Sequence, residues 1–248
     1  MALDWNYGNG DLGNQGVHQM DIARWVLGEK ELAPMAFSIG GRLGYEDDGE
    51  TPNTQIIFQE YKKAPLIFEV RGLPAKTGVE KMDHYHGASI GVVADCENGR
   101  LVIPSYEEAI VYDKDDKEIK RWKAGGDHFG NFIKAIRSRK HTDLVADAEE
   151  GHISAALCHT ANISYRLGKK ESSDKIRDAI KNDKDATEAL GRMEEHLAAN
   201  DVDCKKTPVT LGAVLKMDVK GERVIDNAAA NKMLTREYRK PFVVPEKV

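Results

Sequence analysis

The order of apolar and polar residues predicts one helix near the start of the chain and then a series of strands. Val17, Met20, Ala23 and Leu27 fall on one side of this helix, which Gly28 is suited to end. The segments rich in β-branched and aromatic residues that we predict as strands are 36–39, 54–60, 66–71, 89–96, 100–103, 109–113 and 118–122. Since short turns join most of them, they should pair as an antiparallel sheet.

Two of these connections have clear turn chemistry. A short polar segment at 62–65 separates the second and third strands and predicts a hairpin. Asn98-Gly99 lies between the next two strands, and this dipeptide suits a type I′ turn. The pattern therefore favours consecutive hairpins over a doubly wound parallel sheet.

Helices return near Asp127. Phe129, Phe132, Ile133 and Ile136 follow the spacing of one helical face, which we expect to pack on the sheet.

A longer helix is predicted over 146–167, with Gly168 at its end. Residues 171–206 are dense in charge and carry only thin apolar stripes, so we expect surface helices that form an exposed excursion. A short strand at 214–219 and a short helix at 227–234 complete the chain. We predict an α+β fold in a single domain, 1–248, with a large, mostly antiparallel β-sheet and helices packed on one face.

Charge and cysteine content exclude some classes of protein. The net charge of −5 gives no reason to expect nucleic acid or an anionic membrane as partner. There is no apolar run of membrane-spanning length, and the N-terminus does not resemble a signal peptide. Cys96, Cys158 and Cys204 are widely spaced and odd in number, which predicts free thiols and a cytoplasmic location.

A glycine-rich segment before the first helix carries the candidate chemistry. Asn14, His18, Asp21 and Trp25 are spaced so that they share the polar face of the helix. A histidine can titrate near neutral pH, so His18 could carry a proton. A helix histidine that only packs is the alternative.

The same segment contains a literal G-x-G-x-x-G, the dinucleotide-binding fingerprint, at Gly8 to Gly13. The residues before it, 2–7, are too polar for a buried parallel strand. The next candidate strand ends in Gly40-Gly41 without the acidic residue that binds ribose, and no helix follows it. We therefore expect no nucleotide-binding loop here.

Residues 8–28 resemble the start of the C-terminal domain of the Gfo/Idh/MocA oxidoreductases. Residues 127–138, 149–168 and 235–245 are similar to later parts of the same family. The resemblance implies a domain built on a large, mostly antiparallel sheet that contacts substrate and forms a homo-oligomer through the sheet face. It also implies NAD(P) as cofactor in the intact enzyme and a small sugar or cyclitol as substrate.

The resemblance assigns roles to three residues of the polar face. It implies that His18 moves a proton to or from the substrate oxygen, with Asn14 and Asp21 supporting it. Many family members have aspartate where this chain has Asn14, and an amide cannot accept a proton usefully at neutral pH. Asn14 could still orient a hydroxyl group or His18.

Other candidates for substrate contact lie in or near the loop or on the long helix. Trp5 could stack on a sugar ring, and Asn9 and Asp11 lie within the glycine-rich segment. His159 could point into a cleft, seven residues after His152, although packing on the helix is the simpler interpretation.

The predicted function is therefore that of a substrate-binding and oligomerisation domain that is inactive alone. The family binds nicotinamide in an N-terminal Rossmann domain, which these 248 residues do not contain, so we expect no cofactor for this chain by itself. One alternative is a non-catalytic carbohydrate-binding or scaffold module. Another is a metal-dependent sugar isomerase or hydrolase that uses His18, Asp21 and a further histidine, although two ligands do not make a metal site and we expect none.

Overall fold

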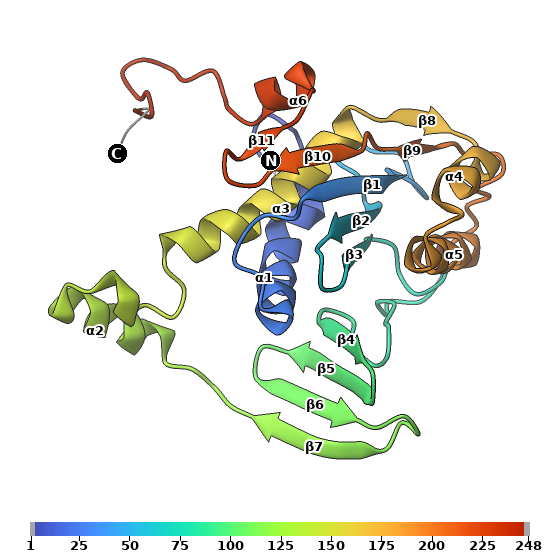
Figure 1. The fold of residues 1–248 in the computed structure, drawn as a ribbon. Coiled ribbons are helices and arrows are strands. Elements are labelled where there is room, and N and C mark those ends of the chain that lie inside the picture. The colour runs from blue at the N-terminus through green and yellow to red at the C-terminus, as the bar shows by residue number, and fades with distance from the viewer. Residues whose placement is uncertain (1–2, 246–248) are drawn as a thin grey trace.

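The computed structural model describes residues 3–245, which form a mixed α+β fold around a large antiparallel sheet (Figure 1). The central strand order is β11-β10-β1-β2-β3, with β9 also pairing with β1 and β8 with β9, and each of these pairs is antiparallel. The strands are β1 (Met35–Gly41), β2 (Thr54–Glu60), β3 (Leu66–Arg71), β8 (Lys169–Glu171), β9 (Val209–Leu211), β10 (Leu215–Asp218) and β11 (Arg223–Val224). The predicted fold class is confirmed.

The remaining strands form a separate antiparallel sheet, β4 (Val92–Cys96), β5 (Gly99–Ser105), β6 (Glu108–Tyr112) and β7 (Glu118–Lys123). The hairpin between β4 and β5 is present as predicted, but its turn differs. Because Cys96 pairs with Gly99, the loop residues are Glu97 and Asn98, and neither has a positive φ. The prediction of a type I′ turn, which needs positive φ at both loop residues, is therefore wrong.

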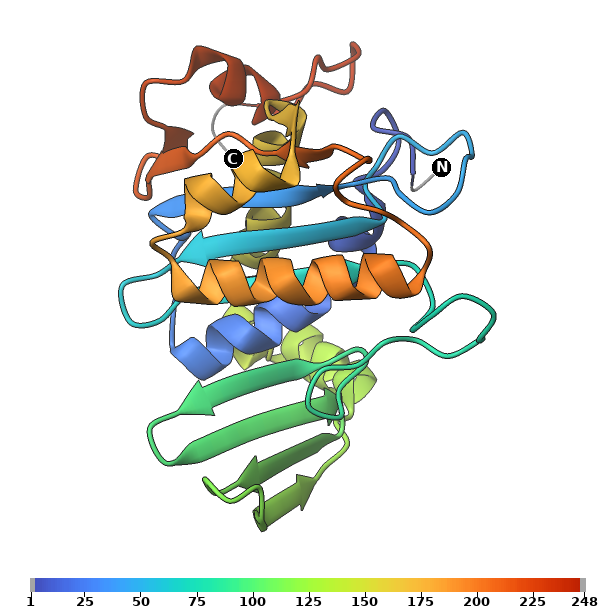
Figure 2. The ribbon, with the colours of Figure 1, turned by 90° about the vertical axis from the view of Figure 1, so that its right-hand side faces the viewer.

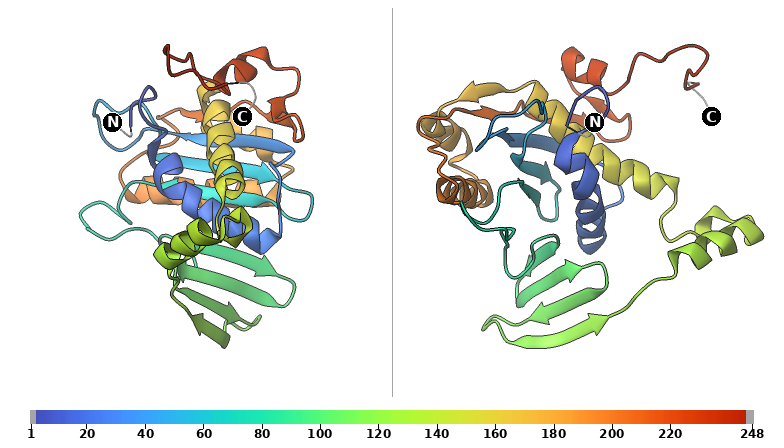
Figure 3. Two further views of the ribbon diagram at one scale, coloured as in Figure 1. Left: turned by 90° about the vertical axis from the view of Figure 1, so that its left-hand side faces the viewer. Right: turned by 180° about the vertical axis from the view of Figure 1, so that it is seen from behind.

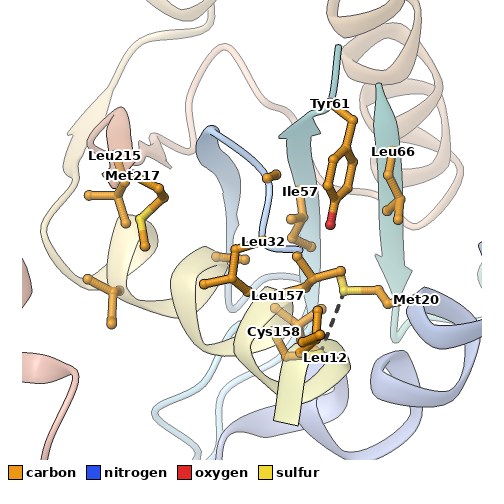
Figure 4. Packing of buried hydrophobic residues seen from close by; sticks show 14 of the residues in the cluster. Leu12, Met20, Leu32, Ile57, Tyr61, Leu66, Leu157, Cys158, Leu215 and Met217 are labelled. Atoms are coloured by element: carbon orange, nitrogen blue, oxygen red, sulfur yellow. Dashed lines mark hydrogen bonds between the residues drawn. The ribbon is translucent and has the colours of Figure 1, made fainter. Parts of the chain in front are cut away.

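One face of the large sheet is covered by two helices that cross it, α1 (Val17–Leu27) and α3 (Ala148–Arg166). A π-helical turn, Leu12–Gly16, leads into α1, and Gly28 ends it with a left-handed φ of 74°, as predicted. Met20 and Cys158 meet between the two helices, and Leu157 packs over Ile57 of β2 in the same cluster (Figure 4). These contacts are the larger part of the core.

The helices α4 (Ser173–Ile180) and α5 (Lys184–Ala199) cover the opposite face of the sheet (Figure 2). Alternate residues of a strand point to opposite faces, so Phe37 and Phe58 turn away from α3 and stack with ring centroids 4.4 Å apart. Ile176, Leu190 and Met193 pack over them and are almost fully buried.

This arrangement corrects two expectations. The excursion at 171–206 is packed on the sheet, because its thin apolar stripes suffice to fill the second core, and helices therefore lie on both faces of the sheet. The sheet face to which the sequence assigns self-association is covered by α4 and α5, and self-association itself stays a prediction.

The helix α2 (His128–Ser138) projects away from the rest of the molecule (Figures 1 and 3). Phe129 and Phe132 are 74% and 57% exposed, and Ile133 and Ile136 are exposed beside them. The expectation that this stripe packs on the sheet is wrong. The irregular residues 124–127 before α2, and the segment 139–147 with its short 3-10 turn after it, carry α2 away from the sheet.

Near the C-terminus α6 (Ala228–Met233) packs beside β11 and α3, and a short 3-10 turn, His141–Asp143, follows α2. Among the residues that the structure describes, no helix is both long enough and apolar enough to cross a membrane.

Replacing Leu190 with alanine tests the second core. We expect a loss of about 2–5 kcal/mol in the free energy of unfolding, because the side chain is 1% exposed and its removal leaves a cavity. Urea unfolding followed by circular dichroism measures the change. Val214→Ala, at a position that is 55% exposed, is the control and should stay within about 0.5 kcal/mol. An equally small effect at Leu190 would mean that α5 does not pack on the sheet.

The cysteines provide a second test, one that depends on pH. All three are free as predicted; Cys96 is exposed, while burial raises the pKa of Cys158 to about 12. Alkylation at pH 8 followed by mass spectrometry should modify Cys96 and spare Cys158 until urea is added. The pKa of the Cys158 thiol is higher in the folded chain than in the unfolded chain. Burial of the neutral thiol therefore contributes its full share to the free energy of unfolding at pH values below about 8.5, the ordinary thiol pKa, and this share is lost as the pH rises above that value. Fast alkylation of Cys158 in the native chain would contradict this packing.

Candidate functional site

The polar face of α1 borders a cavity between this helix and the smaller sheet, which we call cavity 1. It has a volume of about 590 Å³ and lies between α1, the first turns of α3 and strands β5 to β7. His18, Asp21 and Trp25 of α1 line one side, and Tyr106 and Trp122 of the smaller sheet line the other. The structure thus brings three of the four residues of the predicted polar face to one cavity.

Asn14 is the exception. It lies in the π-helical turn before α1 and is exposed to solvent, outside the lining of cavity 1. A π-helical turn contains more residues than an α-helical one, so a side chain within it is rotated from its place on a regular helical face. His18, one turn later, is also exposed, and its ring meets the ring of Tyr106 edge-on at 6.0 Å between centroids.

The glycine-rich segment packs against its own chain. A side chain at Gly13 would collide with Asn9, whose amide lies 2.0 Å from the position of a Cβ atom. Gly10 has a φ of +72° and lies against Thr51. Residues 3–7 form turns and no strand. The glycines therefore permit close packing, and the geometry does not fit the strand, phosphate loop and helix of a dinucleotide site.

Arg24 joins α1 to α3 and was not predicted from the sequence. Its side chain is 1% exposed, and its guanidinium forms ion pairs with Asp21, at 3.3 Å, and with Glu150. The Ser154 hydroxyl donates to the same Asp21 oxygen at 2.6 Å, and Arg24 donates to the Glu29 carbonyl at 2.9 Å. Asp21 is therefore held by Arg24 and Ser154 and orients the helix that carries His18.

Tyr106 lines cavity 1 and contacts two α1-side glutamines that line a second cavity. Its hydroxyl accepts hydrogen bonds from the side-chain amides of Gln15, at 2.7 Å, and Gln19, at 3.2 Å. Tyr106 lies in the turn between β5 and β6, and an aromatic residue in a tight turn carries no local signal for such a contact. It was therefore missed at the sequence level.

The second cavity, cavity 2, measures about 930 Å³ and lies between α1, β3, β4 and α5. Arg192 donates to Glu69 at 2.9 Å, and its guanidinium lies 4.7 Å from the ring centre of Tyr85. Asp83 accepts from Arg71; burial would raise the pKa of this carboxyl, but hydrogen bonds from the His84 amide and from Arg71 outweigh it and lower the pKa. Arg71 and Arg192 are therefore paired with Glu69 and Asp83, while the lining of cavity 2 as a whole holds more carboxylates than cations.

The four residues predicted to bind substrate are dispersed. Asp11 lines cavity 2, on the other side of α1 from His18. The ring of Trp5 packs on Tyr165, with centroids 6.5 Å apart, and under the guanidinium of Arg166 at 5.1 Å.

Asn9 uses its carbonyl to accept a hydrogen bond from Asn162 at 2.8 Å. His159 lies on α3 outside the lining of both cavities, and its pKa is lowered by desolvation and by Arg236 and His152. The structure therefore does not bring Trp5, Asn9, Asp11 or His159 to His18.

Metal ligands do not cluster in the described part of the chain. Between residues 3 and 245, no group of three or more histidine, cysteine, aspartate or glutamate side chains has the arrangement to hold a metal ion.

Comparisons with known proteins find similarity among solved structures alone. No protein-family model matches the chain, and no curated protein matches it. A proposed NADPH-dependent oxidoreductase from Desulfitobacterium hafniense is similar at 15% identity, with a TM-score of 0.47 and coverage of 63% of this chain and 46% of that one.

Two further solved structures are similar over comparable lengths. An oxidoreductase from Agrobacterium radiobacter, in complex with NAD+, L-tartaric acid and magnesium, has 15% identity, a TM-score of 0.44 and coverage of 61% of this chain and 46% of that one. The WlbA dehydrogenase from Bordetella pertussis, in complex with NADH and UDP-GlcNAcA, has 14% identity, a TM-score of 0.38 and coverage of 62% and 44%. The chain spans just under half the length of these three structures.

Replacing Arg24 with methionine tests the link between α1 and α3. The change leaves Asp21 and Glu150 without their cation, and we expect unfolding to become easier by roughly 2–3 kcal/mol, less than for a fully buried pair because both carboxylates keep some solvent contact. Thermal and urea unfolding measure the effect. Arg177→Met, which removes a half-exposed partner of Glu194, is the matched control and should cost about 0.5 kcal/mol. Equal losses in the free energy of unfolding for the two variants would show that the buried ion pairs of Arg24 stabilise the fold no more than an exposed pair does.

Proposed function

We propose that this chain is the substrate-binding and oligomerisation part of an NAD(P)-dependent oxidoreductase that acts on a small sugar or cyclitol. Cavity 1 would hold the substrate, and His18 would exchange a proton with one of its hydroxyl groups. The single observation that carries the proposal is the position of His18 in the wall of a cavity that also contains two tryptophans and a tyrosine.

The walls of cavity 1 suit a sugar or cyclitol in size and chemistry. Its volume lies within the range of small-molecule sites. Trp25, Tyr106 and Trp122 present aromatic surface, against which the C–H faces of a ring can pack. Glu107 and Ser154 supply oxygen atoms that can accept hydrogen bonds from hydroxyl groups. No lysine or arginine lines the cavity, so a neutral polyol suits it better than a phosphorylated one.

His18 can accept or return a proton in this setting. Oxidation of an alcohol releases a proton together with a hydride, and an imidazole beside the hydroxyl group is suited to take that proton. Asp21 cannot share this role while it is engaged by Arg24 and Ser154, so it supports His18 by fixing α1.

The nicotinamide cofactor does not fit the residues described here. Gly10 and Gly13 are packed against Thr51 and Asn9, and no strand precedes them, so the loop offers no cradle for a pyrophosphate. Any NAD(P) would be bound by another domain or chain, and no hydride step is assigned to this one.

Tryptophan fluorescence offers a sharp test of the substrate proposal. The chain has three tryptophans, of which Trp25 and Trp122 line cavity 1 and Trp5 lies elsewhere. Titration with a panel of neutral sugars and inositols should change the emission of the chain for at least one of them. We expect this change to persist in Trp5→Phe and to disappear when Trp25 and Trp122 are both replaced by phenylalanine.

Calorimetry with the same ligand then tests His18. His18→Ala should weaken binding by roughly fivefold, as expected for one lost hydrogen bond, whereas His152→Ala, exposed on α3, should leave the affinity unchanged. If no polyol binds, or if the fluorescence change follows Trp5, the proposed substrate class is wrong. Binding of NADH or NADPH at micromolar affinity would overturn the conclusion that the glycine-rich segment does not hold a nucleotide.

A further inference from the structure

The most conspicuous unexplained surface of the molecule is the apolar stripe of α2. We call residues 124–147 the arm; it contains α2 and the non-helical segments on either side of it. Phe129 and Phe132 are its most exposed apolar side chains, and Ile133 and Ile136 continue the stripe. A contiguous apolar patch of this kind on a water-facing helix indicates a surface that binds another protein surface.

Hydrogen bonds within the arm fix α2 to the segment that follows it. The Asn131 amide donates to the Asp143 carbonyl at 2.7 Å, and its oxygen accepts from the Val145 amide at 3.1 Å. Asp147, at the end of the arm, caps α3 by accepting from the Glu149 and Glu150 amides. In this arrangement the apolar stripe stays exposed.

Cavity 1 has the complementary chemistry. Its lining includes Ile22, Trp25, Ile103 and Trp122, which are apolar or aromatic, and its charged residues are all acidic. Two of these acids are paired, whereas Glu107 forms no ion pair among the described residues.

The middle of the arm has the opposite charge. The segment 128–142 contains lysine and arginine but no acidic residue, whereas Asp127, Asp143 and Asp147 lie toward the ends of the arm. Arg137 follows Ile133 by four residues, so it flanks the apolar stripe. An apolar stripe with a basic edge thus matches an apolar cavity with an acidic edge.

We propose that the occupant of cavity 1 is the arm of a second copy of this chain, in a symmetric dimer in which each copy inserts its arm into the cavity of the other. The roots of the arm, Ala124 and Ala146, line the rim of cavity 1. When one arm enters the partner cavity, the two cavities therefore face each other and the second arm is placed to do the same.

Reciprocal insertion would bury both apolar stripes and both cavities in one two-fold interface. The arm and a sugar would occupy the same space, so the dimer is the closed form of the cavity and the monomer is the open form.

This inference rests on the self-association in the proposed function. Because the arm and a sugar would share cavity 1, the sugar titration is also made on the chain with Phe129→Ser and Phe132→Ser, whose cavity would be open. A wild-type chain that stays monomeric overturns this inference, whereas absence of polyol binding to that variant overturns the proposed substrate.

Sedimentation and light scattering of the full chain over a range of concentrations should show a reversible dimer. Replacing Phe129 and Phe132 together with serine should weaken dimerisation at least roughly tenfold. Phe242→Ser is the matched control, because Phe242 is 73% exposed and Phe129 is 74% exposed, and it should leave the dimer unchanged.

A charge exchange and a cross-link test which surfaces meet. Arg137→Glu and Glu107→Arg should each weaken the dimer, and a mixture of the two single variants should associate better than either alone. In a Cys96→Ser background, one chain carrying Phe132→Cys and a tagged chain carrying Ala109→Cys should form a covalent heterodimer on mild oxidation. A chain that stays monomeric at high concentration, a dimer that ignores the phenylalanine changes, or a cross-link that forms within a single chain carrying both cysteines would each overturn the proposal.

Discussion

The orientation of α1 depends on one buried cation. Arg24 is an arginine enclosed between two helices, where an unpaired charge would be costly, and its position is tolerable because Asp21, Glu150 and the Glu29 carbonyl surround it. These groups come from α1, from α3 and from the turn after α1, so all three must be in place at once. The same arrangement sets which way the rest of α1 faces and hence where His18 lies.

The two faces of the large sheet are covered in different ways. On one face α1 and α3 pack over Ile57 and leave their outer sides free to border the cavities. On the other, α4 and α5 form a closed second core around Phe37 and Phe58. Cavity 1 lies on the first face, at the place where the smaller sheet approaches α1. The position of cavity 1 follows from the packing of whole elements, although its chemistry comes from a few side chains.

Local patterns were sufficient to predict most elements, because local interactions decide them. The strands at 54–60 and 66–71 agree with β2 and β3, whose β-branched and aromatic residues are separated by a short polar turn. The helix α2 was predicted as well, but the exposure of its apolar stripe was not. Periodicity shows that one face of a helix is apolar, and it does not show what packs against that face. For the same reason α4 and α5 were expected to be exposed.

Long-range contacts explain the other differences in the site. Arg24 looked like an ordinary helix residue, because its partner Glu150 lies 126 residues away in the chain. Trp5, Asn9 and His159 were plausible candidates by residue type, yet whether such residues meet His18 is decided by how α3 crosses the sheet. The shared face of His18, Asp21 and Trp25 could be predicted because it depends on helical spacing alone.

The hydrogen bonds of Tyr106 determine how the turn of the smaller sheet meets α1. The ring lines cavity 1, and its hydroxyl group accepts from Gln15 and Gln19, two residues that line cavity 2. A ligand of cavity 1 that moved this ring would therefore also disturb two side chains in the wall of cavity 2.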